Sequence, residues 1–210
     1  MIIPTSELKE FLDEKVTLYN NPKFIESDPI QIPNQFSKKE DIEIAGFLTA
    51  TIAWGNRKMI INNANTLMDL LDNSPHDFIV NHQEKELKRF HNFVHRTFNA
   101  MDMVQFVKSL QHIYQKHHGL EQSLAIKDGT DNYKTAISNF KAHFFEITHL
   151  HRTQKHISDP LRGSAAKRIN MYLRWMVRND KSLTELSSCG TCLSRKARFS
   201  LTLPQNLHKK

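Results

Sequence analysis

Apolar residues recur at intervals of three and four positions along most of the first 180 residues, which places them on one face of an α-helix. The pattern predicts helices over six stretches of the chain, namely 5–18, 37–54, 56–71, 99–119, 120–127 and 130–147, and one or two short helices within 75–90. Only 6 glycines and 7 prolines are present, too few for an all-β chain rich in turns. We therefore expect an all-α protein.

Polar side chains mark where these helices should begin. Ser37, followed three residues later by a glutamate, has the spacing of a capping box, in which both side chains accept backbone N–H groups. Gly55 suits a left-handed helix end and Asn56 can cap the next helix, so 37–71 should form two tightly joined helices. Asn99 is the expected cap of a later helix.

Charge is distributed unevenly along the chain. Residues 1–147 carry 16 Lys or Arg against 19 Asp or Glu, a net charge of −3. Residues 148–178 carry 7 against 1 and residues 179–210 carry 6 against 2, which gives net charges of +6 and +4. The positive charge therefore begins at about residue 148. A one-sided positive field attracts polyanions, of which nucleic acid is the commonest.

A glycine turn followed by a basic helix lies inside this positive region. Gly163 permits a backbone conformation that other residues resist, and Ser164 can cap the helix that follows. Such a turn presents backbone N–H groups to an anion, and lysine and arginine beside it would contact neighbouring phosphates. Seven residues are expected to bind nucleic acid, namely Arg162, Gly163, Ser164, Lys167, Arg168, Arg174 and Arg178. The alternative is an ordinary amphipathic helix with a solvated basic face.

The sequence Gly-Ser-Ala-Ala-Lys-Arg-Ile-Asn from residue 163 resembles the hairpin of the helix-hairpin-helix DNA glycosylases, the endonuclease III superfamily. That hairpin reads Gly-x-Gly-x-Lys-Thr-Ala-Asn. Gly163, Lys167 and Asn170 match it, and Ala165 replaces its second glycine. The paired helices at 41–72 resemble the first core helices of that fold. The resemblance implies an all-α helical bundle similar to the first part of a helix-hairpin-helix DNA glycosylase.

A second resemblance covers more of the chain. His95–Asn99, His156–Pro160 and Gly163–Arg178 resemble an uncharacterised bacterial family of hypothetical proteins, which residues 1–180 fit well. Both families continue after the hairpin helix to a segment resembling Leu-Asp-Thr-His, which supplies a catalytic aspartate. This chain has no such segment, and Asp180 is its last aspartate. We therefore expect a chain that is truncated, or altered in reading frame, shortly after that residue.

The glycosylase resemblance implies a protein that binds double-stranded DNA and takes a base out of the duplex. Lys167 occupies the position of the lysine that attacks the sugar in some members, so it is the candidate catalytic residue. Arg168 beside it would favour the neutral amine. The alternative is that Lys167 only contacts phosphate or solvent.

Three functions stay open at this point because the missing aspartate segment leaves catalysis unsupported. The first is a DNA-binding, DNA glycosylase-like protein that contacts the duplex backbone. The second is a non-enzymatic helical module that binds nucleic acid or another partner. The third is a truncated fragment without a function.

Metal and cofactor sites are not expected. Cys189 and Cys192 have metal-ligand spacing, but a structural zinc site needs four ligands and His208 is the one further candidate nearby. An iron–sulfur cluster needs four cysteines. His91 and His95 are four residues apart without the glutamate of a zinc-protease motif between them.

Two regions are expected along the chain. Residues 1–180 should form one all-α globular domain, and residues 181–210 a basic tail that is rich in serine and threonine and poorly ordered. No run of about 18 apolar residues and no signal peptide are present, so we expect a cytoplasmic protein without a membrane partner. The sequence leaves the oligomeric state open.

Overall fold

The computed structural model describes residues 4–19, 22–126 and 132–177. Its α-helices are α1 (Thr5–Tyr19), α2 (Pro22–Glu26), α3 (Lys39–Thr51), α4 (Arg57–Leu70), α5 (Pro75–Asn81), α6 (Ala100–Lys116), α7 (Gly119–Leu124), α8 (Tyr133–Phe144) and α9 (Lys167–Val177). Short 3₁₀ helices connect them, namely η1 (Pro29–Gln31), η2 (Pro33–Gln35), η3 (Glu84–Asn92), η4 (His151–His156) and η5 (Pro160–Arg162). The strands β1 (Val94–His95) and β2 (Phe98–Asn99) form a small antiparallel hairpin. The predicted all-α class is confirmed.

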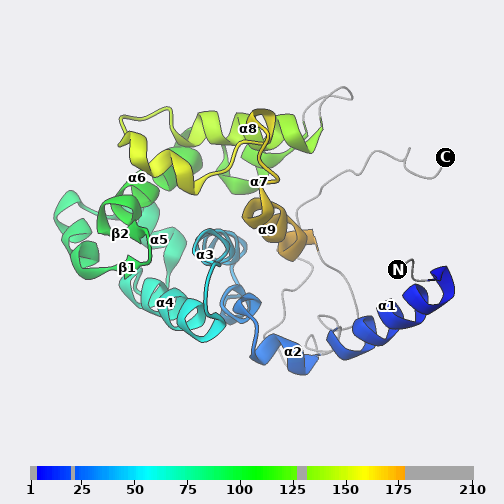
Figure 1. Cartoon of the computed structure of the whole chain (residues 1–210). Helices are drawn as coiled ribbons and strands as arrows, with labels where there is room; N and C mark the ends of the chain where they lie inside the picture. The colour runs from blue at the N-terminus through cyan, green and yellow to red at the C-terminus, as the bar shows by residue number, and fades with distance from the viewer. Residues whose placement is uncertain (1–3, 20–21, 127–131, 178–210) are drawn as a thin grey trace.

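Helix α3 lies in the middle of the molecule, with α4, α5, α7 and α9 packed around it (Figure 1). Every residue from Ile42 to Thr51 is buried, because this helix is apolar or small on nearly all of its faces. The Phe47 ring lies at its centre and contacts rings from three other helices, namely Phe106 at 6.0 Å, Phe140 at 5.6 Å, Phe144 at 5.7 Å and Tyr172 at 5.7 Å between centroids.

Helix α9 packs directly on α3 through a glycine. A Cβ atom at Gly46 would lie 2.9 Å from the Met176 Cε atom and 3.4 Å from the Tyr172 ring, so the absence of a side chain allows close approach. The predicted apolar stripe of α9, which includes Ile169 and Leu173, is buried, and Tyr172 and Trp175 are buried with it. The basic helix is therefore anchored to the centre of the protein.

The predicted helix starts were right where an asparagine caps the helix. The Asn56 side chain accepts the Met59 N–H group at the start of α4. Asn99 and Asp102 form a reciprocal capping box at the start of α6. The capping box at Ser37 was wrong, because α3 begins two residues later at Lys39 and has no side-chain cap.

Two other helix predictions need correction. The helix expected from residue 130 begins at Tyr133, and Asn132 caps it by accepting the N–H groups of Lys134 and Thr135. Helix α1 forms where predicted, but it buries none of its side chains and lies away from α3 in Figure 1. Its apolar residues stay exposed, namely Leu8, Phe11, Leu12 and Val16.

None of the described helices is long and apolar enough to cross a membrane.

A carboxyl group is buried beside the central helix. Glu43 on α3 is 2% exposed, accepts a 2.9 Å hydrogen bond from the Tyr114 hydroxyl and lies 3.7 Å from the Lys39 ammonium. Lys39 also forms an ion pair with Glu121. Burial raises the pKa of Glu43 to about 7, although the Tyr114 hydrogen bond and the Lys39 charge oppose this shift.

Glu43→Gln should change how stability depends on pH. The folded protein holds a proton on Glu43 up to about pH 7, whereas the unfolded chain releases it near pH 4.5. The free energy of unfolding should therefore fall as the pH rises from about 4.5 to 7 and stay level above that. The variant lacks this loss, so its stability relative to wild type should rise by about 3 kcal/mol across the interval.

Urea denaturation at pH 5 and pH 8 measures this difference. Glu10→Gln, on the exposed face of α1, is the matched control and should follow the wild-type profile. Parallel profiles for the wild type and Glu43→Gln would contradict a raised pKa at Glu43.

Candidate nucleic-acid interface

The turn before α9 is held by bonds within itself. Asp159 caps η5 by accepting the Leu161 N–H group, and the Ser164 N–H group donates to the Asp159 carbonyl oxygen. Gly163 adopts a φ of +82°, as the sequence predicted for a glycine turn. The Ser164 hydroxyl accepts the Ala166 N–H group at 3.2 Å. Ser164 therefore caps the turn that precedes α9, and its expected role as the cap of the helix itself was wrong.

This turn is open to solvent. Arg162, Ser164 and Lys167 are exposed, and no described atom lies within 4 Å of the position that a Cβ atom at Gly163 would take. Arg174 is exposed two helical turns after Lys167. We call Arg162, Gly163, Ser164 and Lys167 the basic turn. Arg178, Asp180, the cysteine pair and the whole predicted tail lie outside the described residues.

Arg168 points inward, unlike its neighbour Lys167. Its guanidinium group lies 4.8 Å from the Trp54 ring and donates a 2.5 Å hydrogen bond to the Thr51 carbonyl oxygen at the end of α3. Burial lowers the pKa of Arg168. Arg168 thus fastens the start of α9 to the last turn of α3, and part of its surface remains exposed.

Trp54 stands at the corner between α3 and α4, where three further segments meet. The His95 ring lies edge-on to it at 5.0 Å, and the His156 ring is stacked at 6.2 Å. Gly55 has a φ of +104°, and an Arg96 nitrogen lies 3.0 Å from where its Cβ atom would be. Arg96 therefore lies over the corner, and a side chain at position 55 would displace it.

The hairpin β1–β2 is joined to this corner through His95. The Asn63 amide donates to His95 Nδ1 at 2.8 Å, and His95 Nε2 lies 3.2 Å from the Trp54 carbonyl oxygen. Because Nδ1 accepts, the proton of the neutral ring is on Nε2 and bonds to that carbonyl. Burial lowers the pKa of His95, which favours this neutral form.

A buried carboxylate holds the other side of the hairpin. Asp102 is fully buried at the start of α6 and accepts hydrogen bonds from the Thr153 hydroxyl at 2.7 Å and the Asn99 N–H group at 3.1 Å. The Arg152 guanidinium lies 3.1 Å from the same carboxylate and also donates to the Asn99 side chain at 2.8 Å. Arg152 is thereby fixed against the hairpin.

His156 completes this buried group as a neutral ring. Its Nε2 atom lies 3.4 Å from an Asp102 carboxylate oxygen, which is too long for a strong ion pair. Burial lowers the pKa of His156 to about 4, although the Asp102 charge opposes the shift. The ring also packs on Phe98 at 4.9 Å between centroids.

Segments that are far apart in the sequence thus meet around Trp54. Exposed or partly exposed cations lie on these segments, and we call them the basic surface, namely Arg57, Lys58, Arg96, Arg152, Lys155, Lys167 and Arg168. The sequence predicted Lys167 and Arg168 here but not Arg152 or its partner Asp102. The Asn99–Asp102 capping spacing was the signal that could have located this carboxylate.

A pocket of about 250 Å³ lies next to the basic turn, between α8 and the 3₁₀ helices η4 and η5. Lys141, Asp159 and Arg162 line it together with Ser138, whose hydroxyl donates to Asp159 at 2.6 Å. This hydrogen bond lowers the pKa of Asp159, and burial lowers the pKa of Lys141. The pocket is therefore lined by both positive and negative side chains where it borders the basic turn.

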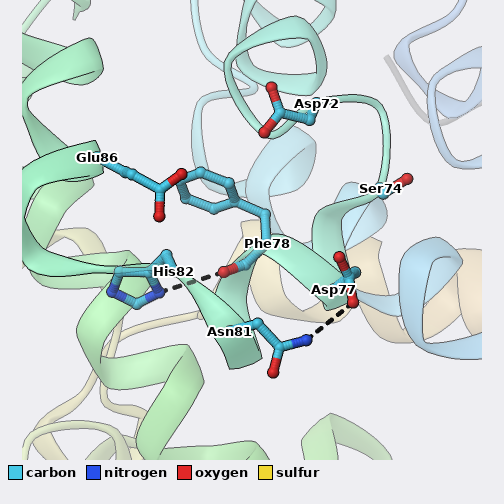
Figure 2. Close-up of a pocket in the computed structure, with 7 residues that line it drawn as sticks. All are labelled: Asp72, Ser74, Asp77, Phe78, Asn81, His82 and Glu86. Carbon is cyan, nitrogen blue, oxygen red and sulfur yellow. Dashed lines mark hydrogen bonds between the residues drawn. The ribbon is translucent and has the colours of Figure 1, made fainter.

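A smaller pocket of about 130 Å³ lies beside α5 and is lined in part by acidic residues (Figure 2). Its carboxylates are already bonded to neighbouring groups: Asp72 to Arg89 at 2.8 Å, Asp77 to Asn81 at 2.8 Å and Glu86 to the Gln83 N–H group at 2.7 Å. The first contact joins the turn after α4 to η3, the second lies along α5 and the third caps η3, so these acidic residues are explained without a ligand.

Asp102→Ala should be strongly destabilising. The change leaves the Thr153 hydroxyl, the Asn99 N–H group and the Arg152 charge without their shared acceptor. Removing one partner of a buried charge pair costs about 3–5 kcal/mol. Urea denaturation at pH 7 measures the loss, and Asp69→Ala on the exposed side of α4 is the control. An equal, small loss in both variants would show that Asp102 does not hold the hairpin.

Comparison with known proteins gives one match. Residues 28–187 match DUF2400, a family described as proteins of unknown function. The match extends seven residues beyond residue 180, where the sequence resemblance was expected to end. Neither the comparison with curated proteins nor the comparison with solved structures gives a match. Because the match covers 160 of the 210 residues, the chain belongs to the DUF2400 family.

Proposed function

We propose that this protein binds double-stranded DNA by contacting the phosphate backbone with its basic surface. The observation that carries the proposal is the convergence of cations from four segments around Trp54. Two of these cations, Arg152 and Arg168, are held in place by protein contacts. Cations that are fixed before binding lose less side-chain entropy when they meet a phosphate.

The basic turn supports the same ligand. The first backbone N–H groups of a helix have no partner within that helix, and α9 begins at Lys167 directly beside the open Gly163 turn. A phosphate at this position would meet backbone donors, the positive end of the helix dipole and the Lys167 ammonium together.

Trp54 favours a duplex over a single strand as the ligand. Proteins that bind single strands stack bases on exposed aromatic rings. Trp54 is instead half-buried, with Arg168 over the ring and His95 against its edge. The ring orients cations and offers little free surface to a base, so binding should depend on backbone charge.

The resemblance of residues 163–170 to the glycosylase hairpin adds to this proposal, because that hairpin contacts DNA. Base excision is a separate step and is not part of it. A Schiff-base lysine must lose its proton, which burial or neighbouring cations favour. Lys167 is exposed, and among the described side chains the nearest cation in the sequence, Arg168, is turned toward Trp54.

A salt series with duplex DNA tests the proposal. Log affinity should fall steeply and linearly with log salt concentration, with a slope of about −0.9 for each phosphate contacted. Lys167→Ala and Arg96→Ala, both on the basic surface, should each weaken binding and reduce the slope by about 1. Arg174→Ala should do the same, because Arg174 is exposed two turns along α9 from Lys167. Fluorescence anisotropy of a labelled duplex between about 50 and 200 mM salt measures both the affinity and its salt slope.

Lys116→Ala is the matched control. Lys116 is exposed at the far end of α6, seventeen residues and about 26 Å along the helix from Asn99 in the hairpin. Binding that falls equally in this variant would mean that only net charge matters. Absence of binding at low salt would reject the proposal. A borohydride-trapped adduct on abasic DNA that disappears in Lys167→Ala would extend the function to base excision.

A further inference from the structure

Two histidines and a glutamate converge at the opposite end of α6 from the basic surface. His112 lies in the penultimate turn of α6, and His117 is the residue at which the helix ends. Glu146 follows the end of α8 by two residues. The Nε2 atoms of both histidines lie close to one Glu146 carboxylate oxygen, at 2.8 Å for His112 and 2.9 Å for His117.

The three side chains are held in position yet open to solvent. The His112 and His117 side chains are 20% and 19% exposed and that of Glu146 is 45% exposed, so an ion could enter from water. The His117 ring is stacked on the His143 ring at 4.1 Å with an interplanar angle of 16°. This stacking fixes the orientation of the His117 ring, and its Nε2 atom stays directed at Glu146.

We propose that His112, His117 and Glu146 form a binding site for a divalent transition metal ion such as Zn²⁺. One ligand atom from each residue lies within 4.8 Å of the other two. Four-coordinate zinc holds nitrogen and oxygen ligands at about 2.0–2.2 Å, which puts neighbouring ligand atoms roughly 3.3–3.5 Å apart. Because Glu146 is the most exposed of the three, a small shift of its carboxylate would open room for the ion.

The chemistry of the ligands selects the kind of metal. Two imidazole nitrogens and one carboxylate suit zinc, copper, nickel or iron, whereas calcium and magnesium prefer oxygen ligands throughout. Three protein ligands leave one position for water or another small ligand. The ion would also join the end of α6 to the segment after α8, which are separated by the connection through α7.

The site is independent of the proposed DNA binding. His112 lies thirteen residues, or about 20 Å, along α6 from Asn99 in the hairpin. Loss of DNA affinity would therefore not remove the metal site, and loss of the metal would not remove the basic surface. The two proposals can fail separately.

Calorimetric titration of Zn²⁺ into the full chain, first treated with a chelator, tests the proposal. Every chain should carry Cys189→Ser and Cys192→Ser, so that thiolates do not compete for the metal. We expect one Zn²⁺ per chain. His112→Ala, His117→Ala and Glu146→Gln should each weaken binding at least about tenfold, since each removes one of three ligands.

His118→Asn is the matched control, because His118 is exposed beside the cluster and asparagine tolerates its φ of +58°. It should bind Zn²⁺ as the parent chain does. At a Zn²⁺ concentration 100 times Kd, the Tm of the parent and control chains should rise by about 5–10 °C. The three ligand variants, with Kd values at least about tenfold higher, should lose at least about half of this rise.

Two results would overturn the proposal. One is the absence of saturable Zn²⁺ binding, which would leave the cluster as two hydrogen bonds to a carboxylate. The other is equal affinity in the control and in Glu146→Gln, which would place the metal elsewhere. Glu146→Gln keeps the size of an exposed side chain, so it tests the site without a risk of unfolding the protein.

Discussion

The end of the central helix imposes the main constraint on this structure. The last carbonyl groups of a helix have no partner within that helix, and α3 ends where the chain is buried. The Thr51 carbonyl oxygen accepts from Arg168, and the Trp54 carbonyl oxygen accepts from His95. These donors come from α9 and from the hairpin, so satisfying the end of α3 and the corner that follows it brings two distant segments to the same place. The basic surface follows from this arrangement, since both donors lie next to exposed cations.

A second buried acceptor repeats this principle. Asp102 collects donors from η4 and from the hairpin, and so keeps Arg152 beside the residues that His95 anchors. His156 stays neutral between Asp102 and Trp54, because burial costs more than the carboxylate gains for the charged ring. The charged and uncharged members of the group therefore have separate roles. Arg152 reaches toward solvent, and His156 fills space.

The sequence predicted where the helices lie along the chain better than which residues they contact. Periodicity and the asparagine caps located α4 and α6, because these signals depend on residues close together in the chain. The contacts of Arg168 with Thr51 and Trp54 were not predicted, because a helical pattern does not say which neighbour a side chain meets. Helix α1 was likewise predicted from its period, although its apolar face stays uncovered by the described residues.

The proposed metal site, formed by His112, His117 and Glu146, shows the same limit more clearly. His112 and Glu146 are 34 residues apart, and the four residues between His112 and His117 match only the histidine half of a zinc-finger spacing. Only the packing of the segment after α8 against the end of α6 brings the three together. Pairs such as His91 and His95 drew attention by their spacing, yet His95 bonds to Trp54 and His91 to the Lys88 carbonyl.

Helix α6 links the two proposed sites through its own polarity. Its N-terminal end carries a partial positive charge, which the buried Asp102 carboxylate balances while it also binds Arg152. Its C-terminal end carries a partial negative charge, next to which His112 and His117 would hold a cation. A cation there is stabilised by about 0.3–1 kcal/mol through the helix dipole alone. The same helix therefore favours the Asp102 carboxylate, which in turn holds Arg152, at the end that faces the basic surface, and a bound metal ion at the other end.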